Sequence, residues 1–381
     1  MTATSHSGEN LREIQRLRRE TEFNLTESQT LRNLVVEARR RGKEVRDYSR
    51  DLSNMAESIS PMLVEQGLIQ VVSVGCDNID GTRLVGIDGS SYPVEGITGV
   101  LYVPMSAACV VFDNGFKTSP KVQVGASIAE LHVSDVMSVG REVSMRMLTM
   151  ETELLWDIAQ DVDRRTVVFL DGPIVDPPME SNSDYVSRRC DAIRTIIGNG
   201  ALVLGVVKSP RDRFLLNHIK SRIGDRHSAI SSSFSSDLHF LAYAFTKTRK
   251  QYGYSEPLAS LHVPITSETT ASLAYGRAGV DIWSFYFQFS KGVRPVRIDW
   301  CREAGSSPEE ATVLAERNRI ARLASLTTYP GMGYPLPVHL AHQKCSIRQG
   351  CAEVLVDEIM TGGRAAPGDE SVIVEILKGR E

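Results

Sequence analysis

The fold is decided by two short segments with the same pattern: Leu-Val-Gly-Ile-Asp-Gly-Ser at residues 84–90 and Thr-Val-Val-Phe-Leu-Asp-Gly at residues 166–172. Each is a mostly apolar run typical of a buried β-strand, and each contains an Asp-Gly pair, at Asp88 and at Asp171. In open α/β folds, ligands bind at the carboxyl ends of the strands. Either Asp-Gly pair alone is also a common turn. Because the two pairs occur in matching contexts, we expect both carboxylates at one ligand site.

A long helix is expected between these two strands, from residue 139 to residue 161. At about 100° per residue, its apolar side chains form one stripe, made of Met147, Leu148, Leu154, Leu155 and Ile158. Glu151 falls near the centre of this stripe, whereas Glu153 points to the opposite side. A carboxylate on an apolar face costs several kcal/mol unless a cation or a proton compensates its charge. We therefore expect Glu151 to face the sheet. The alternatives are another helix register or a carboxylate that caps a buried donor.

The remaining periodic segments predict a mixed α/β sheet flanked by helices. Two antiparallel strands are expected after the first strand, at 99–103 and 107–112, in a meander broken by glycine, proline and asparagine. Beyond residue 172, helices and strands alternate. Helices are expected at 184–198, 212–222 and 237–246 and in a last long segment that ends near 326, with strands at 201–207, 281–289 and 293–298.

The composition is that of a globular protein. The 381 residues are 42% hydrophobic and 24% charged, with 43 Lys and Arg against 47 Asp and Glu, which excludes a disordered or fibrous chain. No apolar run approaches the roughly 20 residues that cross a bilayer, and the first residues lack the apolar stretch of a secretory signal. Six cysteines form no C-x-x-C pair, so they are expected to be reduced and mostly buried. These features predict a soluble cytoplasmic protein.

Local charge suggests three regions. Residues 1–75 are expected to form a helical N-terminal extension, and its segment from Leu11 to Arg50 holds eleven basic and seven acidic residues. Residues 76–350 are expected to form the main domain. Residues 351–381 form an acidic C-terminal segment. The net charge of −4 exerts no overall attraction on nucleic acid, so any DNA contact depends on local basic patches, which are also common as solvated helix faces.

The order of the acidic residues resembles the RNase H-like nuclease core, in which an Asp on the first strand, a Glu on the first helix and an Asp on the fourth strand converge on divalent metal. A second motif narrows the resemblance. Residues 329–342, Tyr-Pro-Gly-Met-Gly-Tyr-Pro-Leu-Pro-Val-His-Leu-Ala-His, form a loop rich in proline and glycine that leads into a short helix. With the two Asp-Gly elements and the spacing of eight from Tyr334 to His342, roughly residues 80–350 resemble the NurA nuclease family.

This resemblance implies a specific chemistry. Asp88, Glu151, Asp171 and His342 would hold metal, and Tyr334 would belong to the same catalytic site, with Glu153 as the alternative to Glu151. The family acts as a Mn²⁺-dependent nuclease, with Mg²⁺ also suited to oxygen ligands, and combines 5′ to 3′ exonuclease with single-strand endonuclease activity. It works as a homodimer with the HerA hexameric ATPase, in DNA end resection or foreign-DNA degradation. The N-terminal extension and the acidic segment depart from the family pattern.

His342 and Tyr334 also have simpler interpretations. His342 could bind metal or transfer a proton at the leaving oxygen, because the ordinary pKa of histidine lies near working pH, or it could be structural. His339 lies near the same helix face and is a fallback ligand. Tyr334 could position a phosphate or stack on a base, or it could be a core aromatic.

A basic group follows the strand at 201–207. Lys208 would lie at the same sheet edge as Asp171 if the two strands are parallel. We expect Lys208, Arg211 and Arg213 to contact the DNA backbone, because phosphate contacts require cations but no base specificity. The alternative is a solvated surface.

The sequence lacks the motifs of several other activities. Gly200 and Gly205 have the spacing of a Walker loop, but Val206 stands where its lysine should follow, and no H-E-x-x-H or G-x-S-x-G motif occurs. Energy for translocation would therefore come from a partner. Two alternatives to the nuclease stay open: a catalytically weak DNA clamp or regulatory subunit of a HerA-like ATPase, and an RNase H-like phosphotransferase, which the missing second nucleotide-binding half disfavours.

Overall fold

The computed structural model describes residues 27–73, 78–95, 100–132, 136–175, 183–224, 226–265, 268–305, 308–329 and 331–360. The first 26 residues of the expected N-terminal extension and residues 361–381 of the acidic segment lie outside the described residues. The chain divides into two compact units, Met1–Ser58 and Ile59–Glu381. None of the described helices is long and apolar enough to cross a membrane.

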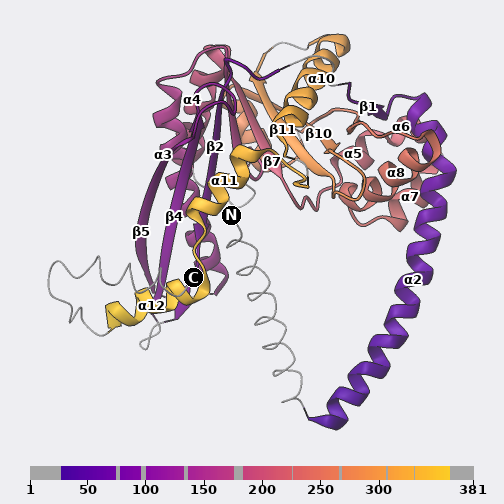
Figure 1. The fold of residues 1–381 in the computed structure, drawn as a ribbon, viewed down its shortest axis with the longest axis horizontal. Coiled ribbons are helices and arrows are strands. Elements are labelled where there is room, and N and C mark those ends of the chain that lie inside the picture. The colour runs from indigo at the N-terminus through magenta and orange to yellow at the C-terminus, as the bar shows by residue number, and fades with distance from the viewer. Residues whose placement is uncertain are drawn as a thin grey trace, which may run out of the picture. The chain divides into compact units, whose positions relative to one another are not determined.

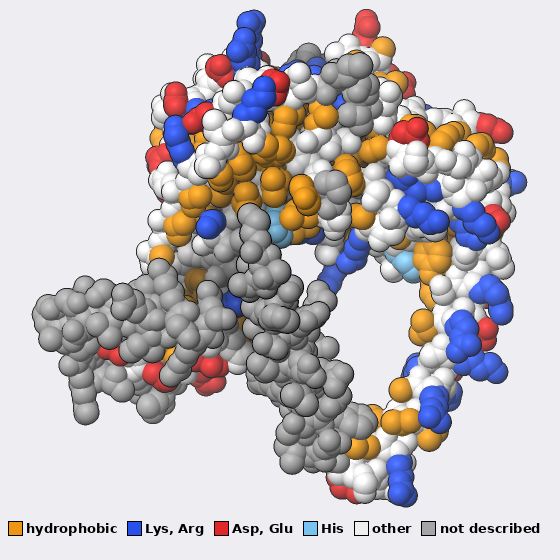
Figure 2. Space-filling view, viewed as in Figure 1, with side chains coloured by type: hydrophobic (Ala, Val, Ile, Leu, Met, Phe, Trp, Pro, Cys, Tyr) orange, Lys and Arg blue, Asp and Glu red, His pale blue; other side chains and the backbone are white. Residues whose placement is uncertain are grey.

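Helix α2, Ser28–Glu65, provides most of the described part of the first unit. Its side chains there are largely exposed and rich in Lys and Arg (Figure 2). Arg40 pairs with Glu37 and Glu44 at helical spacing, which stabilises an exposed helix by a few tenths of a kcal/mol per pair. The basic segment that ends at Arg50 is therefore a solvated, internally paired helix over its described length.

A sheet of eleven described strands forms the centre of the second unit (Figure 1). Its main path runs β1-β8-β10-β11-β7-β6-β2-β4-β3, with β5 paired to β4 and β9 paired to β10. Strands β2, β6 and β7 are parallel, whereas β4 is antiparallel to β2, and β11 to β7. The bounds are β1 Ile69–Val71, β2 Arg83–Ser91, β3 Val94–Glu95, β4 Val100–Phe112, β5 Lys121–His132, β6 Thr166–Asp171, β7 Leu202–Val207, β8 Leu258–Ser260, β9 Val263–Pro264, β10 Val280–Gln288 and β11 Val296–Glu303.

The meander differs from the sequence prediction. The two strands expected at 99–103 and 107–112 form one long strand, β4, and the second antiparallel strand is β5. Pro104 does not break β4. The carbonyl of Pro104 accepts the N–H of Tyr92, so this side of Pro104 faces the residues between β2 and β3. Proline has no N–H to donate, and because β4 pairs with neither strand at this position, no ladder bond is lost. The sequence did not predict β5, because this strand is exposed along most of its length and shows no buried apolar pattern.

Helices cover both faces of the sheet. The expected helix at 139–161 is α3, Val136–Ala159, and the last long helix is α10, Glu310–Thr327. The expected helix at 212–222 is two short helices, α5 and α6, and the strand expected at 293–298 begins only after Pro295. The other bounds are α4 Ser183–Gly198, α5 Phe214–His218, α6 Lys220–Ile223, α7 Arg226–Ser233, α8 Asp237–Tyr252, α9 Thr270–Arg277, α11 Leu336–Cys345 and α12 Gln349–Met360.

Alternate residues of β2 point to opposite faces of the sheet, and each face has its own core. Val85 and Ile87 belong to the core shared with α3, α4 and α9. Leu84 belongs to the opposite core, shared with α10 and α11. Helix α11 lies close against β2, since a Cβ at Gly86 would come 2.2 Å from the carbonyl oxygen of Pro337. Gly86 therefore sets how near α11 comes to the strand that carries Asp88.

Candidate metal centre

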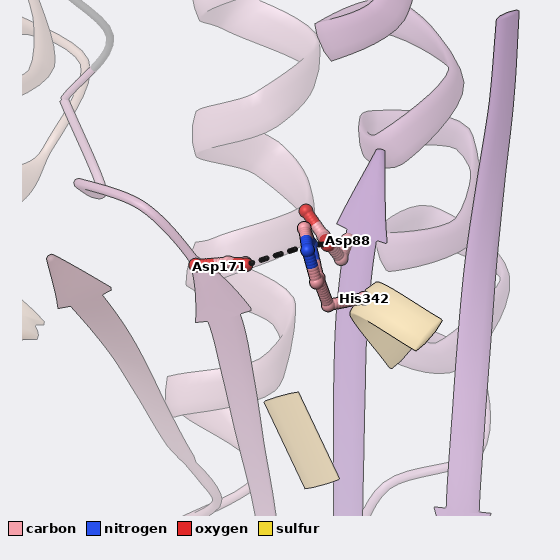
Figure 3. A group of neighbouring side chains, drawn as sticks. All are labelled: Asp88, Asp171 and His342. Carbon is pink, nitrogen blue, oxygen red and sulfur yellow. Dashed lines mark hydrogen bonds and ion pairs between the residues drawn. The ribbon is translucent and has the colours of Figure 1, made fainter. Parts of the chain in front are cut away.

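Three of the expected site residues meet at one edge of the sheet. One potential ligand atom from each of Asp88, Asp171 and His342 lies within 4.8 Å of the others (Figure 3). The Nδ1 atom of His342 is 2.7 Å from Oδ2 of Asp88 and 3.7 Å from Oδ2 of Asp171. Two strands and a helix from distant parts of the chain thus converge on one point.

Strand register brings the two aspartates together. Parallel pairing of β2 with β6 ends at Ile87 opposite Leu170, and Asp88 and Asp171 come next on their strands. Side chains alternate along each strand, so both aspartates share the face that α11 covers, with Leu84 on β2 and Phe169 on β6. The convergence of the two Asp-Gly segments expected from the sequence is therefore present.

Asp88 has an unfavourable environment for its charge. The residue is only 5% exposed, and burial together with the charge of Asp171 raises its pKa to about 6, although the hydrogen bond with His342 acts in the opposite direction. The backbone N–H of Gly89 donates to Oδ1 of Asp88 at 2.8 Å. Two neighbouring carboxylates in this position are stabilised by a proton or by a cation.

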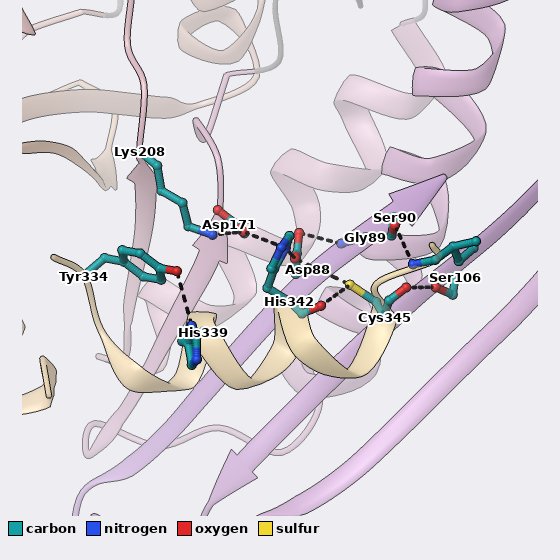
Figure 4. A network of polar contacts seen from close by, with 11 residues as sticks. Asp88, Gly89, Ser90, Ser106, Asp171, Lys208, Tyr334, His339, His342 and Cys345 are labelled. Carbon is teal, nitrogen blue, oxygen red and sulfur yellow. Dashed lines mark hydrogen bonds and ion pairs between the residues drawn. The ribbon is translucent and has the colours of Figure 1, made fainter. Parts of the chain in front are cut away.

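Lys208 provides one cation. Its Nζ is 2.5 Å from Oδ2 of Asp171 and lies 4.4 Å from the centre of the Tyr334 ring (Figure 4). The parallel pairing of β6 with β7 places Lys208 at this edge, as the sequence suggested. Tyr334 forms a hydrogen bond with Nδ1 of His339 at 3.2 Å, so it orients Lys208 and His339 rather than contacting the carboxylates.

Glu151 faces the sheet, as the helical periodicity predicts. It is 3% exposed, and a Cβ on Gly89 would lie 2.6 Å from its Oε1. Gly89 points to the face opposite Asp88, so Glu151 reaches the site from the other side of β2 and stays outside the cluster of three ligand atoms. Glu153 points away and pairs with Arg188 at the surface.

Sequence reasoning missed Cys345. Its Sγ lies 3.5 Å from Oδ2 of Asp88, and burial and Asp88 raise the pKa of this thiol. Its spacing of three from His342 in a helix was the available signal. Two further contacts hold the end of α11: Ser106 Oγ donates to the carbonyl of Cys345, and the N–H of Ile347 donates to Ser90 Oγ.

The two arginines expected to bind DNA have different surroundings. Arg213 donates to the carbonyl and Oγ of Ser231 at 2.5 and 2.6 Å, so its guanidinium is directed to α7. Arg211 is exposed on the loop that follows Lys208. Of the two, only Arg211 is free to meet a phosphate near the site.

The donor set fits a divalent metal ion. Carboxylate oxygens suit Mg²⁺ and Mn²⁺, and an imidazole nitrogen beside them suits Mn²⁺ better than Mg²⁺. A bound cation would also offset the burial and the charge of Asp171, which together raise the pKa of Asp88. Asp88, Asp171 and His342 are thus the residues that could hold the ion.

Fold and site together define a class of protein. The strand order β5-β4-β2-β6-β7, with acidic residues on β2, β6 and α3, is that of an RNase H-like fold. The family model of the NurA domain matches residues 82–347. The chain therefore belongs to the NurA family of nucleases.

One of the similar solved structures supports this fold. The crystal structure of the NurA nuclease from Sulfolobus solfataricus is 16% identical, with a TM-score of 0.56 over 87% of this chain and 96% of that chain. A crystal structure of NurA bound to dAMP and manganese is 13% identical, with a TM-score of 0.45 over 86% of this chain and 98% of that chain. A search of curated protein sequences finds no match.

Proposed function

We propose that the chain is a metal-dependent deoxyribonuclease that hydrolyses phosphodiester bonds with an ion held by Asp88, Asp171 and His342, assisted by Glu151. The observation that carries this proposal is the cluster of two largely buried carboxylates and a histidine within 4.8 Å at the edge of an RNase H-like sheet. Mn²⁺ is the proposed ion and Mg²⁺ the second choice, because the cluster contains an imidazole nitrogen.

A bound divalent ion supplies charge neutralisation at the phosphate and lowers the pKa of water. The protein groups have separate tasks. Asp88 and Asp171 bind the cation. Lys208 leaves Asp171 and contacts the phosphate instead. When the ion is bound, His342 would be its ligand through Nδ1, which lies beside Oδ2 of Asp88 and Oδ2 of Asp171, with the ring proton on Nε2. Tyr334 is proposed to act in the site by orienting Lys208.

The decisive experiment is a nuclease assay on end-labelled DNA with Mn²⁺, with Mg²⁺ and with chelator. Asp88→Ala should lower the rate by about a thousandfold, since metal contributes several kcal/mol to such reactions. Asp113→Ala is the matched control, because Asp113 is an exposed aspartate that pairs with Lys121. Unchanged cleavage by Asp88→Ala would refute the proposal. The same labelled ends report 5′ to 3′ exonuclease and single-strand endonuclease cleavage, which we propose as the two modes of action.

One observation favours a second candidate. The ammonium of Lys208 already neutralises Asp171, as expected of a catalytically weak DNA clamp or regulatory subunit of a HerA-like ATPase. Calorimetric titration with Mn²⁺ separates the two functions. Binding that disappears in Asp88→Asn supports the nuclease, whereas DNA binding without metal binding supports the clamp.

We further propose that the chain forms a homodimer and works with a HerA-like hexameric ATPase in DNA end resection or foreign-DNA degradation. In support of association, the edge strand β5 exposes Val122, Val124 and Ile128. Light scattering of the chain alone, and then with the ATPase, tests both associations. A strictly monomeric chain would contradict the first, and absence of a complex the second.

The proposed nuclease domain is 76–350, flanked by a helical extension at 1–75 and an acidic segment at 351–381. The family match over 82–347 supports the central part. A cytoplasmic location is proposed as well. It agrees with the described cysteines, which are all unpaired and, apart from Cys351, buried.

A further inference from the structure

A cavity opens at the same sheet edge, on the face opposite Asp88. Its volume is about 360 Å³, and its lining includes Pro173, Val207, Phe214 and Arg297. Val207 alternates with Val206 and Lys208 along β7, and Val206 belongs to the core on the α11 side. The cavity therefore lies on the other side of the sheet from the carboxylate cluster and shares only its edge.

The chain connects this cavity directly to the metal centre. Pro173 is two residues beyond Asp171, so their Cα atoms are at most about 8 Å apart. Val207 and Ser209 line the cavity and flank Lys208, which pairs with Asp171. A nucleotide whose phosphate is held at the cluster can thus extend around the sheet edge toward the cavity.

The walls suit a flat apolar group. Most of the lining is apolar, and Phe214 contributes an aromatic ring with the guanidinium of Arg297 5.5 Å from its centre. Hydrogen bonds fix the backbone next to this ring. Both oxygens of Asp237 accept backbone N–H groups at the start of α5, from Leu215 and Leu216, at 2.7 and 2.9 Å. Base stacking on aromatic side chains is tolerant of sequence.

Three polar residues of the lining, Asp212, Thr269 and Ser272, already have hydrogen-bond partners. Asp212 accepts from Tyr286 at 2.7 Å and from Arg297, and Thr269 and Ser272 bond to each other at 3.0 Å. These groups therefore offer few free donors or acceptors with which to recognise the edges of a base. Arg211, at the rim, makes no ion pair with any residue that the structure describes, and suits a backbone phosphate.

We infer that this cavity is a base slot, which takes one unstacked nucleobase of the DNA strand next to the scissile phosphodiester without selecting its identity. The inference rests on the proposed nuclease function. Such a slot would hold a single strand without reading its sequence, since the base is gripped by shape and stacking alone.

The test compares two phosphodiester substrates, a single-stranded oligonucleotide and an abasic oligonucleotide of the same length, which has no bases. Phe214→Ala, which removes the ring, and Val207→Phe, which fills the slot, should each raise KM for the oligonucleotide about tenfold. Turnover of the abasic oligonucleotide should stay within about twofold of wild type. Phe116→Ala is the matched control, because it removes a ring that packs on Phe112 at the opposite end of β2.

A scan with single abasic sites in the oligonucleotide needs no variant and so is independent of folding defects. One abasic position near the cut should raise KM for the wild type about tenfold, and Phe214→Ala should lose this difference. Equal effects of the variants on both substrates, or no sensitive abasic position, would overturn the slot. Failure of the wild type to cleave either substrate would instead overturn the proposed nuclease function.

Discussion

Replacing Asp88 by asparagine should stabilise the metal-free protein while it abolishes metal binding. Burial and the charge of Asp171 raise the pKa of Asp88 from 3.8 to about 6. The folded protein therefore binds this proton more tightly than the unfolded chain does. The corresponding stability is fully present below about pH 4 and is lost as the pH rises through about 6.

The expected size follows from these pKa values. One pKa unit corresponds to about 1.36 kcal/mol, so ionising Asp88 costs the folded state about 3 kcal/mol near pH 7. Asparagine has a similar shape, keeps a carbonyl oxygen for the N–H of Gly89 and carries no charge. Asp88→Asn should therefore raise the free energy of unfolding by up to about 3 kcal/mol near pH 7, and by little near pH 4.

Urea unfolding in chelator at the two pH values measures this difference. Asp113→Asn is the control of opposite sign, because the ion pair with Lys121 lowers the pKa of Asp113, and its removal should not stabilise. With Mn²⁺ at a hundredfold excess over Kd, the wild type should gain about 2.7 kcal/mol and Asp88→Asn should gain nothing. A variant no more stable than the wild type near pH 7 in chelator would refute the electrostatic argument.

Three further substitutions test the surroundings of the site. Glu151→Gln should lower nuclease activity about ten- to hundredfold, whereas Glu153→Gln, which loses only an exposed ion pair, should leave it unchanged in the same assay. Gly89→Ala should lower the free energy of unfolding in urea by about 1–3 kcal/mol, because the added Cβ would meet Glu151. Gly140→Ala, on an open helix face, should be neutral or stabilising. Equal losses of stability in the two variants would argue against the steric reasoning. Lys208→Met should weaken DNA binding and should lower the number of counterions released on binding by about one. If the salt dependence of the binding constant, measured by fluorescence titration, is unchanged, Lys208 does not contact the DNA.

Much of the fold follows from local pattern. Apolar runs mark β2, β6 and β7 because a strand buried on both faces consists almost entirely of apolar residues. The apolar stripe of α3 correctly turns Glu151 toward the sheet. Strand β5 and the division between α5 and α6 were missed, since an exposed edge strand and two short helical turns carry little periodic signal.

By itself, the sequence determined most of the strands and helices, and it placed Asp171 at the end of a buried strand. Those properties depend on residues close together in the chain. Asp88, expected to end its strand, lies inside β2, which continues to Ser91. Only the tertiary structure decided that His342, 254 residues beyond Asp88, bonds to it, that Cys345 lies beside it, and that Lys208 neutralises Asp171. His342 and Cys345 reach Asp88 because α11 packs closely on β2 at Gly86, where a Cβ would come 2.2 Å from the carbonyl oxygen of Pro337, so these contacts depend on both segments at once.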